Sequence, residues 1–142
     1  MIRVIYKILL IGVLCFVFFG CTFLVKELHI SVPPQIVAED PDFVGTPTEW
    51  AATVSTAYPV PNPYDGVSAN LTVQLIASGP GADNLNLIDG TVVILQGESV
   101  GSFFVSAIYD GTPVADETVT ITAQAVGYEE DSATITIRFP SP

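Results

Sequence analysis

Positively charged side chains are scarce in this chain. It has four Lys and Arg residues against fifteen Asp and Glu residues, which gives a formal net charge of −11 over 142 residues. All the acidic residues lie after position 25, and the only basic side chains in that part of the chain are Lys26 and Arg138. Such a surface repels phosphate backbones and anionic lipid head groups. The composition therefore argues against nucleic acid as a partner and indicates a well-solvated extracellular domain.

Cysteine and histidine are also nearly absent. Cys15 and Cys21 both lie within the first 25 residues, and His29 is the only histidine. The rest of the chain therefore has no disulfide framework, no thiol chemistry and too few ligands for a structural zinc site. A Ser-His-Asp arrangement would need a loop serine beside His29, and no local sequence motif indicates such a serine. No glycine-rich loop precedes a helix, so a nucleotide site has no motif either. We predict that the protein is not an enzyme.

The first 25 residues differ sharply from the rest. Arg3 and Lys7 are their only charges, residues 8–19 are apolar, and Gly20-Cys21 follows. A basic segment followed by an apolar one is typical of an export signal. An uncleaved anchor is an alternative, because residues 8–25 contain no charge and are just long enough to span a bilayer. In that case Arg3 and Lys7 would hold the N-terminus in the cytoplasm.

Phe18-Phe19-Gly20-Cys21 resembles the lipobox of bacterial lipoproteins, in which a small residue precedes an invariant cysteine. The resemblance implies that Cys21 carries a lipid (diacylglycerol and palmitate) and becomes the mature N-terminus. We therefore predict a lipoprotein signal peptide or membrane anchor over residues 1–21 and a short tether over 22–27. Simple secretion is a third reading. All three readings place the remaining domain outside the cytoplasm, in the cell envelope. The lipoprotein and the uncleaved anchor would also attach it to a membrane, at a bacterial outer membrane or cell surface.

Residues 28–142 predict one all-β domain. Val119, Ile121 and Ala123 alternate with polar residues, and turn-forming residues separate several runs of this kind. Seven short strands over this length predict a two-sheet immunoglobulin-like sandwich, with Trp50 in its core. The expected strands are His29–Val37, Glu49–Ala57, Leu71–Ala77, Thr91–Leu95, Ser102–Tyr109, Thr118–Gln124 and Ser132–Phe139.

Several of these runs resemble the Calx-beta family and its bacterial immunoglobulin-like relatives. The resemblance rests on Leu71–Leu75, Gly90–Ile94, Phe103–Asp110, Glu117–Ile121 and Ser132–Ile137. It implies a Calx-beta-like sandwich. Members of the family are modules of adhesins and surface proteins; some bind calcium, and many are spacers.

Alternate loops of such a sandwich should share one pole, which faces away from the membrane. Calcium binds carboxylates on loops, and the resemblance matches calcium-binding positions to Glu39, Asp110, Asp116 and Glu117. The family has tandem acids where this chain has Tyr109-Asp110, and acids after its last strand that have no counterpart after Phe139. Solvated loop acids are therefore the alternative to a calcium site. The nine acids expected at this pole are Glu39, Asp40, Asp42, Glu49, Asp83, Asp89, Asp110, Asp116 and Glu117.

These features together predict a membrane-anchored, extracytoplasmic, immunoglobulin-like module. Its expected role is non-catalytic: binding a protein or glycan partner, adhesion, or structure. A calcium-dependent adhesion module that uses the acidic pole is one alternative. An accessory domain of an envelope enzyme or transport system is another.

Overall fold

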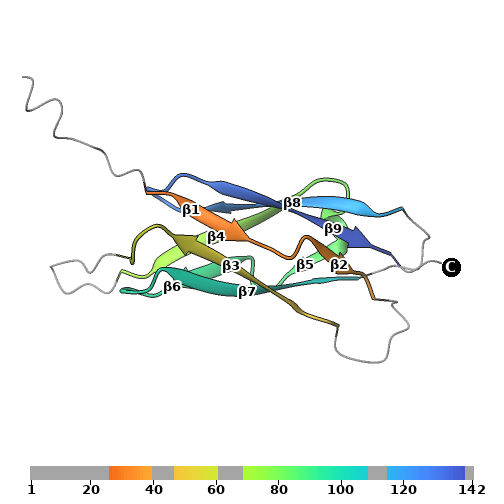
Figure 1. The fold of residues 1–142 in the computed structure, drawn as a ribbon, viewed down its shortest axis with the longest axis horizontal. Coiled ribbons are helices and arrows are strands. Elements are labelled where there is room, and N and C mark those ends of the chain that lie inside the picture. Colours follow the sequence, from red (N-terminus) through yellow and green to blue (C-terminus); the bar gives the residue numbers. More distant parts are fainter. Residues whose placement is uncertain (1–25, 40–46, 61–68, 109–114, 140–142) are drawn as a thin grey trace, which may run out of the picture.

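The computed structural model describes residues 26–39, 47–60, 69–108 and 115–139 (Figure 1). The predicted signal segment and Cys21 lie outside these ranges. Within them, no helix is long and apolar enough to cross a membrane. The described residues form nine strands and one short 3-10 helix: β1 (Leu28–Ser31), β2 (Gln35–Val37), β3 (Trp50–Thr56), β4 (Leu71–Ser78), η1 (Ala82–Asn84), β5 (Leu85–Leu87), β6 (Thr91–Ile94), β7 (Val100–Ala107), β8 (Glu117–Gln124) and β9 (Asp131–Arg138).

The strands form two sheets that enclose one hydrophobic core. The first sheet has the order β1-β3-β7-β5, and the second has the order β2-β9-β8-β4-β6. All strand pairs are antiparallel except β2 with β9. The prediction of an all-β sandwich is confirmed.

The first expected strand, His29–Val37, is in fact two strands that belong to different sheets. Pro33 and Pro34 separate them, because proline has no N–H for a strand ladder and restricts the residue before it. Before the prolines, β1 pairs with β3, and after them, β2 pairs with β9. The Pro34 carbonyl accepts a hydrogen bond from Thr136 N at 3.1 Å, which guides the chain into the second sheet.

A second difference from the expected strands is β5, a three-residue strand that pairs with β7. It is too short to show the alternation from which strands are predicted. After β5 the chain crosses to β6 in the other sheet through Asp89 and Gly90, which both have positive φ angles (67° and 58°). The chain thus changes sheets at every connection from β1 to β8, and only β8 and β9 follow each other within one sheet.

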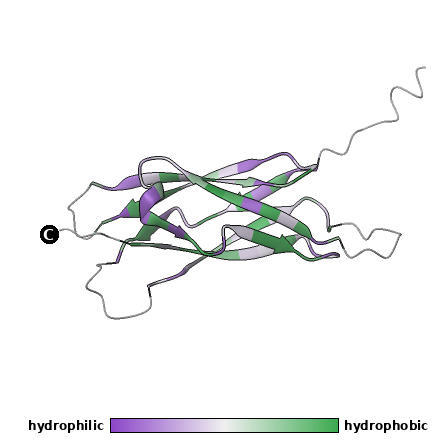
Figure 2. Cartoon of the chain, turned by 180° about the vertical axis from the view of Figure 1, so that it is seen from behind, coloured by the Kyte–Doolittle hydropathy of each residue, from purple (hydrophilic) through white to green (hydrophobic). Residues whose placement is uncertain are grey.

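Hydrophobic and hydrophilic residues follow one another along the strands (Figure 2), and the buried hydrophobic side chains form one core. Val119, Ile121, Ile135 and Ile137 have no solvent exposure, whereas Thr134 lies on the exposed face. Trp50 is half-buried and packs against the core, as predicted. Two-residue alternation therefore predicts correctly which side chains of the last two strands are buried.

The two sheets lie close together where β7 passes β6. A Cβ atom added at Gly101 would lie 2.4 Å from Val92 Cγ1 and 3.1 Å from Ile94 Cγ1. Both neighbours are buried. A glycine is required here by the close approach of β6.

The start of β1 is joined to the second sheet as well as to β3. Leu28 N donates to Glu129 O at 3.1 Å, and Glu129 N donates to Lys26 O at 2.7 Å. Asp131 Oδ2 accepts from Ile30 N at 2.9 Å. Lys26, in the predicted tether, is therefore already part of the folded domain.

Candidate functional site

The sandwich has two ends, which differ in what they carry. β1 begins beside the end of β3, with Leu28 opposite Thr56, and beside the β8–β9 turn. We call this the tether end, because the predicted tether reaches the domain here. At the other end, Val37 lies opposite Arg138, and Trp50 lies opposite Val105. We call this the acidic end.

Three of the four predicted calcium residues lie at the acidic end. Glu39 follows β2; its N–H donates to Ala107 O at 3.2 Å, and its Oε1 accepts from Thr48 N at 2.8 Å. Its Oε2 is buried and has no hydrogen-bond partner among the described residues. Asp110 lies outside the described residues.

The other two carboxylates already have partners. Asp116 Oδ2 lies 3.5 Å from Arg138 Nε, and both side chains are more than half exposed. Glu117 Oε2 accepts a hydrogen bond from Asn84 Nδ2 at 3.1 Å. The part of the chain that the structure describes holds no group of three or more His, Cys, Asp or Glu residues that could bind a metal. The calcium site therefore stays a prediction.

The predicted nine-acid pole needs a correction at Asp89. This residue lies at the crossover from β5 to β6, where the Gly90 carbonyl accepts a hydrogen bond from Leu75 N at 2.9 Å, partway along β4. Asp89 lies away from the acidic end because β5 runs from that end toward the tether end before the turn. Asp40 and Asp42 lie outside the described residues.

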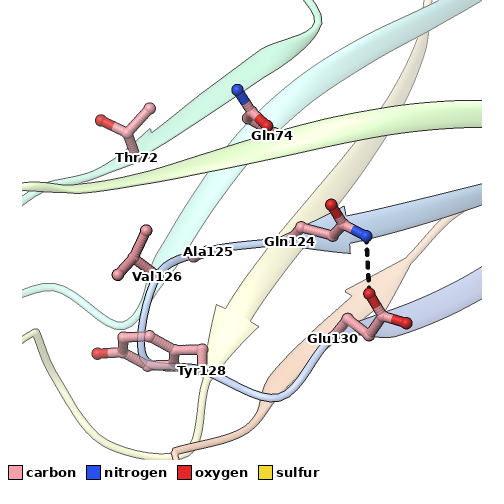
Figure 3. Close-up of a pocket in the computed structure, with 7 residues that line it drawn as sticks. All are labelled: Thr72, Gln74, Gln124, Ala125, Val126, Tyr128 and Glu130. Carbon is pink, nitrogen blue, oxygen red and sulfur yellow. Dashed lines mark hydrogen bonds between the residues drawn. The ribbon is translucent and has the colours of Figure 1, made fainter.

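A hollow of about 640 Å³ opens over the second sheet near the tether end (Figure 3). Its lining comes from β4, from the last residue of β8 and from the β8–β9 turn. Side chains with hydroxyl, amide, carboxylate and phenol groups line it. The lining residues are Thr72, Gln74, Gln124, Ala125, Val126, Tyr128 and Glu130.

The strand register explains how β4 and β8 contribute. Thr72 and Gln74 occupy alternate, exposed positions of β4. Gln124, the last residue of β8, is the direct cross-strand partner of Gln74. The two amide side chains therefore come from neighbouring strands at the same level of the sheet.

The β8–β9 turn forms the wall of the hollow. Gly127 has a φ of 81°, and Tyr128 N donates to Ala125 O at 3.2 Å, which closes the turn. The chain returns beside β8, where Gln124 Nε2 donates to Glu130 Oε2 at 2.7 Å. This charge-assisted hydrogen bond fixes the orientation of the Gln124 amide.

Tyr128 connects the hollow to the predicted tether. Lys26 Nζ lies over its ring, 5.5 Å from the centroid, in a cation–π contact. The same ring also borders a smaller hollow of about 200 Å³, lined in part by Glu27 and Tyr58. The tether end thus has two aromatic side chains close to the place where the chain arrives.

Sequence reasoning missed the larger hollow. The available signal was weak: Gln74 and Gln124 lie on the polar faces of two expected strands, and Tyr128 follows a turn glycine. Which residues of two distant strands lie opposite each other cannot be read from the pattern of each strand alone. The hollow therefore appears only once the register of β4 and β8 is known.

No model of a protein family matches the chain, and no curated protein matches it in sequence. Among solved structures, a two-domain protein of unknown function from Bacteroides fragilis aligns at 12% identity with a TM-score of 0.56. The alignment covers 85% of this chain and 48% of that chain. The periplasmic chaperone SfaE aligns at 8% identity with a TM-score of 0.51, over 81% of this chain and 58% of that one.

The chain thus spans about half the length of these two proteins, and at such identities the likeness shows the fold alone. The apo-form Calx CBD1 domain also aligns, at 14% identity with a TM-score of 0.49, over 82% of this chain and 99% of that domain. The Calx-beta resemblance and the lipidation of Cys21 both stay predictions.

Proposed function

We propose that the protein is a membrane-attached, extracytoplasmic binding module that holds its ligand in the hollow at the tether end and catalyses no reaction. The observation that carries this proposal is the hollow itself, which polar and aromatic side chains from β4, β8 and the β8–β9 turn line. Concave sites of several hundred Å³ with a few convergent polar groups are the usual form of small-molecule sites.

Attachment through Cys21 is the first part of the proposal. Changing Cys21→Ala removes the proposed lipid acceptor, so lipid labelling and signal cleavage should be lost together. Cells that make the protein would be fed a fatty-acid analogue, and the mass of the intact product would be measured. A native product that is unlabelled and still begins at Met1 would favour the uncleaved anchor instead.

Occupancy of the hollow is the second part. Val126 is 98% exposed and lines the hollow, so a photo-reactive side chain there should not disturb packing. We expect Val126→p-benzoylphenylalanine to form covalent adducts in intact cells on illumination. Thr134→p-benzoylphenylalanine is the control, because Thr134 is also exposed on the second sheet but does not line the hollow. Equal adduct patterns at the two positions would contradict the proposal.

A further inference from the structure

We infer that the hollow binds a neutral carbohydrate. This inference rests on the proposed function, since it names the ligand class of the same site. It follows from three properties of the lining: its charge, its hydrogen-bonding groups and its aromatic ring.

The charge of the site disfavours an anion. Glu130 contributes a carboxylate to the lining, and Glu129 and Asp131 are its neighbours in the chain. Of the two basic residues that the structure describes, Lys26 lies over the Tyr128 ring, and Arg138 lies beside Asp116 at the other end. A phosphate, sulfate or carboxylate ligand would therefore meet like charge at Glu130.

The uncharged lining groups can both donate and accept hydrogen bonds. An amide side chain offers two N–H donors and a carbonyl acceptor, and a hydroxyl offers one donor and two lone pairs. Gln74 and Thr72 have no side-chain hydrogen bond to the other described residues. Gln124 uses one N–H for Glu130 and keeps its carbonyl and its second N–H. Adjacent hydroxyls of a sugar, which also donate and accept, match this set.

The remaining wall is less polar. Tyr128 adds an aromatic side chain to the lining, and Val126 adds an aliphatic one. A sugar has an apolar face of C–H groups, which packs against such surfaces, while its hydroxyls reach the amides. An apolar ligand would leave the desolvated side chains of Thr72 and Gln74 without partners, which is costly.

The position of the hollow limits where the sugar comes from. If Cys21 carries the lipid, the five residue steps to Lys26 span at most about 17 Å. The hollow at the tether end therefore lies close to the membrane surface. The ligand is then either the sugar head group of a lipid or a free oligosaccharide of the envelope, and both share the same recognition chemistry.

Saturation-transfer-difference NMR tests the inference with the full chain in phosphocholine micelles. The probes are lactose, cellobiose, maltose and N,N′-diacetylchitobiose. We expect transfer to at least one of them, and about a tenfold weaker affinity in the double variant Gln74→Ala/Gln124→Ala, because two side chains lose hydrogen bonds. Thr134→Ala should bind like the unchanged protein. Melting curves of each variant confirm that it is folded.

A matched pair of ligands tests the role of charge. 3′-Sialyllactose should bind more weakly than lactose, and Glu130→Gln should reduce this difference. Equal binding of the two sugars by the unchanged protein would overturn the assignment to neutral ligands. No transfer to any neutral disaccharide, or equal transfer in the folded double variant, would overturn the sugar assignment altogether.

Vesicles separate the two sources. The full-chain Val126→p-benzoylphenylalanine protein would be reconstituted in phosphatidylcholine vesicles with and without digalactosyldiacylglycerol and then illuminated. Adducts with the glycolipid that depend on Gln74 and Gln124 support a lipid head group, and binding of free sugars alone supports a soluble oligosaccharide. If no sugar binds but Val126 adducts still form, this inference is wrong and the proposed binding function stands. If neither occurs, both are wrong.

Discussion

At the scale of single residues, the face on which a side chain lies decides what a substitution costs. Ile135 and Thr134 are neighbours in β9, yet Ile135 is fully buried and Thr134 is exposed. Alternation in the sequence predicts this difference correctly. The same change at both positions is therefore a direct test of the strand register.

We expect Ile135→Asp to unfold the domain, because the buried carboxylate would have no partner, at a cost of several kcal/mol. Thr134→Asp should cost no more than about 1 kcal/mol, because its side chain faces water. Circular dichroism melting curves of the two variants would show the difference. Equally small effects at both positions would mean that the register of β9 is wrong.

The acidic residues show that the sequence can predict the position of a side chain without predicting its partner. Glu39, Asp116 and Glu117 were expected at one end, and the structure places all three there. Their partners, Thr48, Arg138 and Asn84, do not follow from the sequence, since each contact joins residues from different segments. The positions of carboxylates at one end therefore do not by themselves predict a metal site, because their hydrogen-bond and ion-pair partners also matter.

At the scale of elements, most of the strands could be predicted and the connections between sheets could not. Strands such as β8 and β9 are long enough to show alternation, so their existence and their buried faces follow from the sequence. β5 has three residues and pairs only with β7, so tertiary contacts alone define it. The hollow depends on Gln74 lying opposite Gln124, a pairing set by the whole second sheet. The sequence does not predict the hollow because it does not predict this pairing.

The contact between β6 and β7 gives a prediction at this scale. Gly101→Ala adds a methyl group that would overlap Val92 Cγ1, and Val92 is buried and restricted in its rotamers. We expect a loss of about 1–3 kcal/mol in the free energy of unfolding, as for other overpacked cores. Denaturant titration would measure it.

Ser102→Ala is the control, because Ser102 is the next residue of β7 and is exposed. It should change the free energy of unfolding by less than about 0.5 kcal/mol. If Gly101→Ala is as mild as Ser102→Ala, the two sheets do not approach each other as closely as described.

At the scale of the whole molecule, both ends carry carboxylates, with Glu130 and Asp131 at the tether end, but their other groups differ. The tether end carries the hollow and two tyrosines, Tyr58 and Tyr128, while the acidic end carries Glu39, Asp116 and Glu117 with Arg138. In between, the described core is apolar, with Thr56 and Ser106 as its buried polar residues. The surface hollow, rather than the interior, is therefore suited to a polar ligand.

The parallel pairing of β2 with β9 also determines how the domain resists tension. Lys26 is at the tether end and Phe139 follows β9 at the acidic end, so pulling these residues apart slides β2 and β9 in opposite directions along their length. The β2–β9 ladder, the Leu28–Glu129 hydrogen bond and the Ile30–Asp131 hydrogen bond would then be loaded together. Pulling Glu117 and Arg138 apart would instead open the β8–β9 hairpin one pair at a time. In single-molecule force spectroscopy, where the unfolding rate governs rupture, we expect a clearly higher rupture force for the first geometry, and equal forces would contradict this. A module built in this way would keep its hollow intact while force acts from opposite ends, on the tether at Lys26 and on Phe139.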